Sequence, residues 1–186
     1  MRRAGAASID RTGSRSTGNA WAGRGDAVDA KVRQKTLRLL SNGVYVLTSR
    51  SADRYGAATV SWVSQVSFKP PLIMAAVRQQ SNVFKCLEES RFAVLHIVGN
   101  GQQEIARRFF FPTAAGCGTI NGEPVVEGKT SAPVLASLPA HVECQVERIV
   151  DTDGDHSMVI LRAVEAECRD EIRPLTIAET PWEYGG

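Results

Sequence analysis

The feature that most constrains the fold of this chain is a series of short apolar runs, rich in β-branched and aromatic residues, that turn residues separate. Runs of this length and composition are typical of β-strands. In the second run, positions 60, 62 and 64 alternate with positions 61, 63 and 65, as in a half-buried antiparallel strand. The predicted strands cover residues 44–49, 57–67, 72–77, 92–98, 140–150 and 157–168.

Short helices are predicted between some of these strands. Residues 31–41 have a helical pattern, and Asn42-Gly43 is expected to end that helix with a left-handed residue. Ser81 is the expected N-cap of a second helix. Asn100 is the expected N-cap of a third helix, in which Gln103 completes a capping box.

The remaining connections are rich in turn residues. Asp151–Asp155 (DTDGD) favours a hairpin between the last two strands, whereas residues 112–132 predict one long loop. Because hairpins dominate and helices are few, we expect a mainly β fold, an antiparallel barrel, rather than alternating strands and helices. The chain contains neither GxGxxG nor GxxxxGK[ST], so neither common nucleotide-binding loop is expected.

Composition and charge indicate which partners to expect. The 186 residues are 43% apolar and 23% charged, as in one soluble globular domain. Residues 1–30 hold five Arg against three Asp, and the 17 basic and 17 acidic residues elsewhere cancel. A neutral body argues against nucleic acid as a partner. No apolar run reaches the roughly 18 residues of a membrane-spanning helix, so no membrane association is expected.

The first 30 residues differ in kind from the rest. They are rich in Ala, Gly, Ser and Arg, which predicts a disordered tail before a domain at 31–186, and they lack the apolar core of a secretory signal. The cysteines lie 31, 27 and 24 residues apart, without metal-ligand spacing. We therefore expect a cytoplasmic protein with reduced thiols, most of them in the core. The four are Cys86, Cys117, Cys144 and Cys168.

Hydroxyl and basic side chains gather in the middle of the chain. Ser81 stands at a predicted helix start, where free backbone N–H groups favour an anion, and Lys85 follows one turn later. Such a set could receive a phosphate, or its basic members could simply face solvent, and the residues alone leave both interpretations open. The set comprises Thr59, Ser61, Ser64, Ser67, Ser81, Lys85, Arg107 and Arg108.

The three histidines differ in their settings. Asp153–His156 has the residues of a turn, although a histidine at the start of a strand can also contact a ligand. His96 lies in an apolar strand and is expected to be a satisfied core residue, whereas His141 has no supporting pattern. No Ser–His–acid order and no paired-carboxylate motif stands out, so a cofactor is expected to carry any chemistry.

Taken in order, these motifs resemble those of the flavin reductase-like family, whose fold is the FMN-binding split barrel. The resemblance runs from about residue 35 to residue 184. SNGVYVLTS resembles the family's Gly-Val-x-Val-x-Thr strand, and GAATVSWVSQVSFKPPLIMAAV resembles its Thr-rich strand followed by Val-Ser, Pro-Pro and an apolar strand. SNVFKCLEES, FAVLHIV and QEIARRFF follow in the family's order, and GDHSMVI resembles its Gly-Asp-His motif.

The resemblance implies a flavin, either FMN or FAD, at the interface of a homodimer. The residues implied at the edge of the isoalloxazine ring are Thr59, Val60, Ser61 and Trp62. Those implied at the ribityl and phosphate end are Ser64, Ser81, Lys85 and Arg107. His156 is the residue implied in catalysis, where it would help to place the nicotinamide of NADH or NADPH. No metal is implied.

The function that the resemblance implies is an NAD(P)H:flavin oxidoreductase, able to supply reduced flavin to a monooxygenase. The alternative is an FMN-binding electron carrier that a protein partner reduces, which Trp62 and the aromatic residues of the C-terminal TPWEYGG favour. A third hypothesis is a binding protein without redox turnover. His156 and its strand favour the first of these functions.

Overall fold

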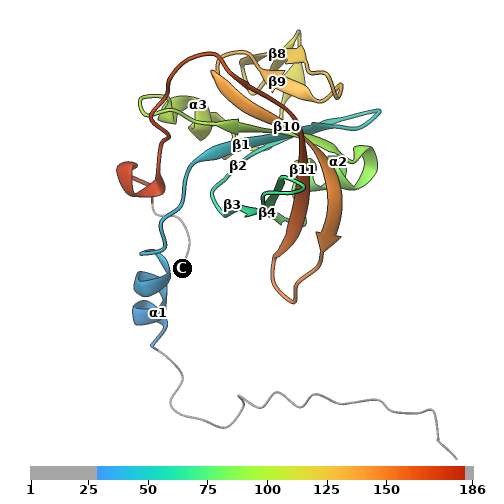
Figure 1. Ribbon diagram of the computed structural model, residues 1–186. Coiled ribbons are helices and arrows are strands. Elements are labelled where there is room, and N and C mark those ends of the chain that lie inside the picture. The colour runs from blue at the N-terminus through green and yellow to red at the C-terminus, as the bar shows by residue number, and fades with distance from the viewer. Residues whose placement is uncertain (1–28, 183–186) are drawn as a thin grey trace, which may run out of the picture.

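The structure, a computed structural model, describes residues 29–182, so nearly all of the predicted tail at 1–30 lies outside the described residues. Seven antiparallel strands form the main sheet, in the order β2-β1-β5-β10-β11-β4-β3 (Figure 1). The mainly β prediction is therefore confirmed. The strands are β1 (Tyr45–Arg50), β2 (Tyr55–Val60), β3 (Val63–Ser67), β4 (Leu72–Arg78), β5 (Phe92–Ile97), β10 (Ala140–Val150) and β11 (His156–Cys168).

The single strand predicted at 57–67 is wrong, because the structure divides it into β2 and β3. β2 pairs with β1, whereas β3 pairs with β4, so the chain changes partners at Ser61 and Trp62. β2 and β3 are the two outer strands of the sheet. Three peptide links span at most about 11 Å, so the sheet must curl until its two edges meet at this link. The curl gives the seven-stranded sheet the shape of a half-barrel.

The loop predicted at 112–132 is also wrong. This segment forms β6 (Ala115–Gly116), β7 (Thr119–Ile120) and β8 (Glu123–Glu127), which join β9 (Pro133–Leu135) in a four-stranded sheet. Asn121-Gly122 turns between β7 and β8, and both residues have positive φ angles, 49° and 81°. Asn-Gly is the residue pair that a two-residue type I′ hairpin turn prefers.

The helices are α1 (Ala30–Leu37), α2 (Asn82–Ser90), α3 (Gln103–Arg108) and a short 3₁₀ helix at Ile177–Glu179. The predicted end of the first helix is wrong, since α1 stops at Leu37 and Gly43 instead bridges to Thr176. Ser81 is confirmed as the N-cap of α2, with its hydroxyl accepting the Phe84 N–H at 3.2 Å. The predicted capping box of α3 is wrong, because its N-cap is Gln102, without a side-chain bond.

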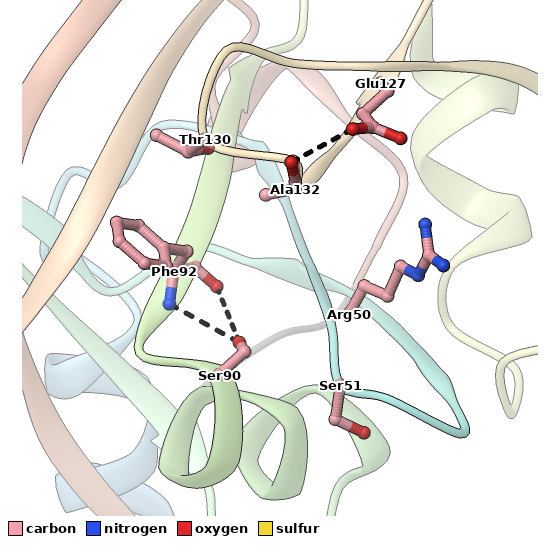
Figure 2. Close-up of a pocket in the computed structure, with 8 residues that line it drawn as sticks. Arg50, Ser51, Ser90, Phe92, Glu127, Thr130 and Ala132 are labelled. Carbon is pink, nitrogen blue, oxygen red and sulfur yellow. Dashed lines mark hydrogen bonds between the residues drawn. The ribbon is translucent and has the colours of Figure 1, made fainter.

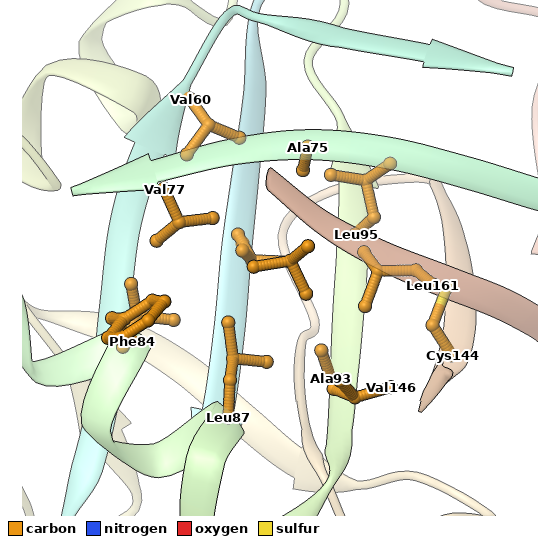
Figure 3. Close-up of a cluster of buried hydrophobic side chains, with 13 residues drawn as sticks. Val60, Ala75, Val77, Phe84, Leu87, Ala93, Leu95, Cys144, Val146 and Leu161 are labelled. Atoms are coloured by element: carbon orange, nitrogen blue, oxygen red, sulfur yellow. The ribbon is translucent and has the colours of Figure 1, made fainter. Parts of the chain in front are cut away.

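The larger apolar core lies between the curled sheet and α2 (Figure 3). Leu47, Leu87 and Leu161 are among its fully buried side chains. Gly56 lets the backbones of β2 and α2 approach closely, because a Cβ there would lie 2.4 Å from the Val83 Cα. The helix start is thereby held directly against β2.

On the other face of the sheet, polar side chains attach the small sheet. His96 is fully buried, with Nδ1 3.0 Å from the Val46 carbonyl oxygen and Nε2 accepting the Leu135 N–H at 2.9 Å. The Thr48 hydroxyl donates to the Pro133 carbonyl at 2.6 Å. These bonds satisfy backbone groups of β9, and the prediction that His96 is a satisfied core residue is confirmed.

All four cysteines are free thiols. Cys86 and Cys144 are buried, whereas Cys117 and Cys168 are exposed, so the expectation that most lie in the core is wrong. Burial raises the pKa of the Cys144 thiol to about 12. This thiol is therefore protonated at neutral pH.

Candidate functional site

A cavity of about 560 Å³ lies where β2, the end of β4, the start of α2 and the segment after α3 come together. His156, at the start of β11, and Trp182, near the C-terminus, complete its walls. The other lining residues fall in the ranges 57–60, 76–78, 80–82 and 109–113. Segments far apart in the sequence thus surround one hollow beside the meeting edges of the sheet.

Bonds from the outer edge of β2 fix one wall. The Thr59 N–H donates to the Phe109 carbonyl at 3.2 Å, and the Thr59 hydroxyl donates to the Ala106 carbonyl at 2.6 Å. The Ala57 N–H donates to Thr113 Oγ1 at 3.0 Å. An edge strand leaves backbone groups unpaired, and here the segment 109–113 takes up part of that edge. The Thr59 hydroxyl is therefore already engaged in holding α3.

Ser81 marks the polar end of the cavity. Its hydroxyl donates to the Arg78 carbonyl at 2.7 Å while accepting the Phe84 N–H, so the turn before α2 is tightly held. The first N–H groups of a helix have no intrahelical acceptor and carry the positive end of its dipole. Arg78 and Gln80 also line this end. The arrangement suits an anionic or hydroxyl-bearing ligand.

His156 lines the cavity, and its ring contacts two neighbouring side chains. Its Nδ1 lies 2.7 Å from Asp155 Oδ1, and its ring packs 4.9 Å from the Trp62 ring, centroid to centroid, at 57°. The hydrogen bond from His156 lowers the pKa of the exposed Asp155 carboxyl below its usual value. Because Nδ1 faces Asp155, Nε2 is the ring nitrogen left to meet a ligand.

Four predicted site residues therefore line the cavity, and five do not. Those that line it are Thr59, Val60, Ser81 and His156. Those that do not are Ser61, Trp62, Ser64, Lys85 and Arg107.

The five differ in where they lie. The Trp62 ring packs against the His156 ring, and Ser61 is buried with no hydrogen-bond partner for its hydroxyl in the described part of the chain. Ser64 is exposed on β3, and Lys85 is exposed on α2, one turn after Ser81. Arg107 is exposed on α3 and lies 3.7 Å from Glu104.

Sequence reasoning missed the aromatic side of the cavity. Phe110, Phe111 and Trp182 all line it, and the Phe110 and Trp182 rings form an edge-to-face pair with centroids 4.8 Å apart. The run of three phenylalanines at 109–111 was a usable signal, because three consecutive side chains cannot all face the same core. In the structure, Phe110 and Phe111 are 47% and 65% exposed. Nothing in the sequence predicts that Trp182 returns to meet them.

Two other hollows lie near the β8–β9 turn. One, of about 380 Å³, is lined by Arg50, Ser90 and Phe92 on one side and Glu127 on the other (Figure 2). The second, of about 390 Å³, includes His141. Neither contains a predicted site residue. Within residues 29–182, no group of three or more His, Cys, Asp or Glu side chains is arranged to hold a metal ion. In the same range, no helix combines the length and the apolar character needed to cross a membrane.

Known proteins resemble this chain in sequence and in fold. A flavin reductase (NADH) from Kitasatospora aureofaciens is 34% identical over 149 residues, covering 78% of this chain and 75% of that protein. Diflavin flavoprotein A 1 from Synechocystis is 29% identical over 129 residues, covering 68% of this chain and 22% of that protein. This chain thus spans about a fifth of the length of the diflavin flavoproteins that it matches.

The fold comparison agrees with the sequence comparison. The solved structure of an NADH:FAD oxidoreductase from Streptomyces globisporus superposes with a TM-score of 0.67 at 23% identity, covering 83% of this chain and 88% of that one. The sequence model described as the flavin reductase like domain matches residues 37–180. The match extends from α1 to the C-terminal segment and includes nearly every wall of the cavity. The chain therefore belongs to the flavin reductase-like family.

Proposed function

We propose that this protein is an NAD(P)H-dependent flavin reductase, which transfers a hydride from a nicotinamide to a flavin held in the 560 Å³ cavity. The observation that carries the proposal is the pairing, in one cavity, of a helix start suited to phosphate with exposed aromatic side chains suited to a flat ring. The relative from Kitasatospora, matched over most of both chains, supports the same activity.

The residues present fit a flavin. The buried Ser61 hydroxyl has no partner among the described residues, and a buried polar group of this kind is normally satisfied by something. Ser61 follows directly on Val60, which lines the cavity. Because Ser61 itself does not line the cavity, the fit to a flavin rests on the helix start at Ser81 and on the aromatic side chains of Phe110 and Trp182. Ser64 is exposed on β3 and lies outside the cavity lining.

The protein's part in the reaction is positioning. A bound flavin accepts the hydride, so the chain needs to hold two rings face to face and need not supply an acid or base for that step. Ser81 and the first turn of α2 would bind the flavin phosphate, with Lys85 reaching it from the next turn of α2 and Arg107 from α3. His156 would orient the nicotinamide through Nε2, while Asp155 and Trp62 hold its ring in place.

A homodimer is part of the proposal. α1 projects from the barrel (Figure 1) and buries none of its residues. Leu39 and Leu40, just after it, are 77% and 64% exposed, and Phe68 beside β3 is 85% exposed. A second copy of the chain would cover such apolar surface. A monomer by light scattering, with flavin still bound, would contradict this part.

We propose FMN or FAD as the flavin, NADH or NADPH as the donor, and a flavin-dependent monooxygenase as a recipient of reduced flavin. A cytoplasmic location remains a prediction, supported by the wide spacing of the four cysteines.

One experiment separates the reductase from the alternatives. The purified protein is mixed with flavin under anaerobic conditions, and NADH or NADPH is added. Catalytic bleaching of the visible flavin band is the expected result. Tight flavin binding without bleaching would favour the electron carrier, which the long diflavin flavoprotein relatives make the second candidate. A protein that binds no flavin would refute both.

A further inference from the structure

Residues 174–182, called the strap, form backbone hydrogen bonds with the segments next to β1 and β5. After β11, Leu175 is buried, donates its N–H to the Val98 carbonyl at 2.8 Å and accepts the Val44 N–H at 2.9 Å. The Ile177 N–H then donates to the Asn42 carbonyl at 2.9 Å. The strap therefore lies in a fixed place across the ends of β1 and β5.

The end of the strap is fixed as well. A capping box between Thr176 and Glu179 closes the short 3₁₀ helix. The Thr180 hydroxyl donates to the Ile177 carbonyl at 2.8 Å, and the Trp182 N–H donates to Thr180 Oγ1 at 3.3 Å. Trp182 thus ends a chain of local bonds that holds its backbone, and its ring meets the Phe110 ring.

Trp182 and Phe110 together form an aromatic wall of the cavity. The two rings meet edge to face at 75°, and both line the cavity together with Thr59 and His156. In an edge-to-face pair one ring leaves a face uncovered, and a flat ligand ring can stack there in an offset arrangement. The neighbour Phe109 is buried and bonded to β2, so this wall is held from both ends.

We propose that Trp182, with Phe110, forms a stacking surface for the isoalloxazine ring of the bound flavin. The inference rests on the proposed function. The polar groups at Ser81 suit the phosphate, whereas the ring faces of the aromatic wall are apolar and suit the large flat ring.

The test compares two ligands that share the ring and differ in the phosphate. Dissociation constants for FMN and for riboflavin are measured for the wild type, Trp182→Ala and Trp182→Phe. Loss of a stacked aromatic partner should weaken both ligands equally, by about three- to tenfold. Trp182→Phe should recover most of the loss, and Phe110→Ala should reproduce it. The absorption spectrum of the flavin bound to Trp182→Ala should shift toward that of free flavin.

Several outcomes would overturn the inference. A loss for FMN but not for riboflavin would place Trp182 at the phosphate. No rescue by Trp182→Phe would indicate a hydrogen bond from the indole N–H in place of stacking, and unchanged affinities would remove Trp182 from the site. Melting temperatures of the variants show whether they are folded. If the wild type binds flavin and oxidises NADH while the variants are unaffected, only this inference fails; a wild type inactive in both assays defeats the proposed function itself.

Discussion

Lowering the pH should loosen the attachment of the small sheet through one buried histidine. The His96 ring is fully buried, and this burial lowers its pKa to about 3 from an ordinary 6.5. Its Nε2 must stay unprotonated to accept the Leu135 N–H, and the nearby His141 lowers the pKa of His96 further. The folded protein therefore resists protonation of His96 that the unfolded chain accepts readily.

The sign and size of the effect follow from proton linkage. Above about pH 6.5 the imidazole is neutral in both states, so it adds no pH dependence. Between that pH and the folded-state pKa of about 3, the unfolded chain binds one more proton, and the free energy of unfolding falls by about 1.4 kcal/mol per pH unit. From about pH 7 to about pH 5 the loss due to His96 is about 2 kcal/mol.

Urea unfolding at these two pH values measures the effect. His96→Gln cannot titrate, so the loss of stability between the two pH values should be about 2 kcal/mol smaller in this variant than in the wild type. His141→Gln is the matched control, because it removes the neighbouring imidazole and keeps His96. Carboxylates contribute to all three proteins and cancel in the comparison. Equal losses in the wild type and His96→Gln would refute the reasoning.

Three further changes test the site. Gly56→Ala places a Cβ against the backbone of Val83, so it should destabilise the protein by about 1–3 kcal/mol and weaken flavin binding. The control Gly116→Ala, with nothing within 4 Å of the added carbon, should do neither, and equal melting temperatures of the two variants would contradict the close contact. Lys85→Ala should weaken FMN binding about tenfold and leave riboflavin binding nearly unchanged, if the ammonium reaches a phosphate at Ser81; similar losses for both ligands would place Lys85 elsewhere. His156→Ala should raise the KM for NADH more than it lowers kcat, as lost ground-state binding does, and an unchanged KM in a folded variant would remove His156 from the nicotinamide position.

The strands could be predicted from local periodicity, but their partners could not. The alternation along 57–67 continues through Ser61 and Trp62, so nothing local indicates that pairing moves from β1 to β4 there. By contrast, β7 and β8 were predictable from the Asn121-Gly122 turn signal, which the low apolar content of the surrounding segment obscured.

The residues of the site also fall into those that a local sequence pattern predicts and those that depend on distant contacts. Ser81 could be predicted because helix capping is a local pattern, and its place in the cavity follows from the helix start. Trp182 could not be placed, because its position depends on bonds between the C-terminal strap and distant strands. Lys85 and Arg107 are exposed on α2 and α3 and do not line the cavity. A sequence pattern cannot distinguish such an exposed position from a position in the cavity wall.

The two-residue link between β2 and β3 makes the hollow a product of chain connectivity. The main-chain path brings β2 beside the end of β4, and these two strands line the hollow together with the start of α2, so the chain's connectivity places its walls. Exposed residues that line it, such as Phe110 and Phe111, belong to neither large apolar cluster and can therefore be exchanged without disturbing the core beneath. In a scaffold of this kind the main chain provides the cavity, whereas the exposed side chains that line it determine which ligand binds. Ligand preference can then change through substitutions of these side chains alone, with stability left nearly intact.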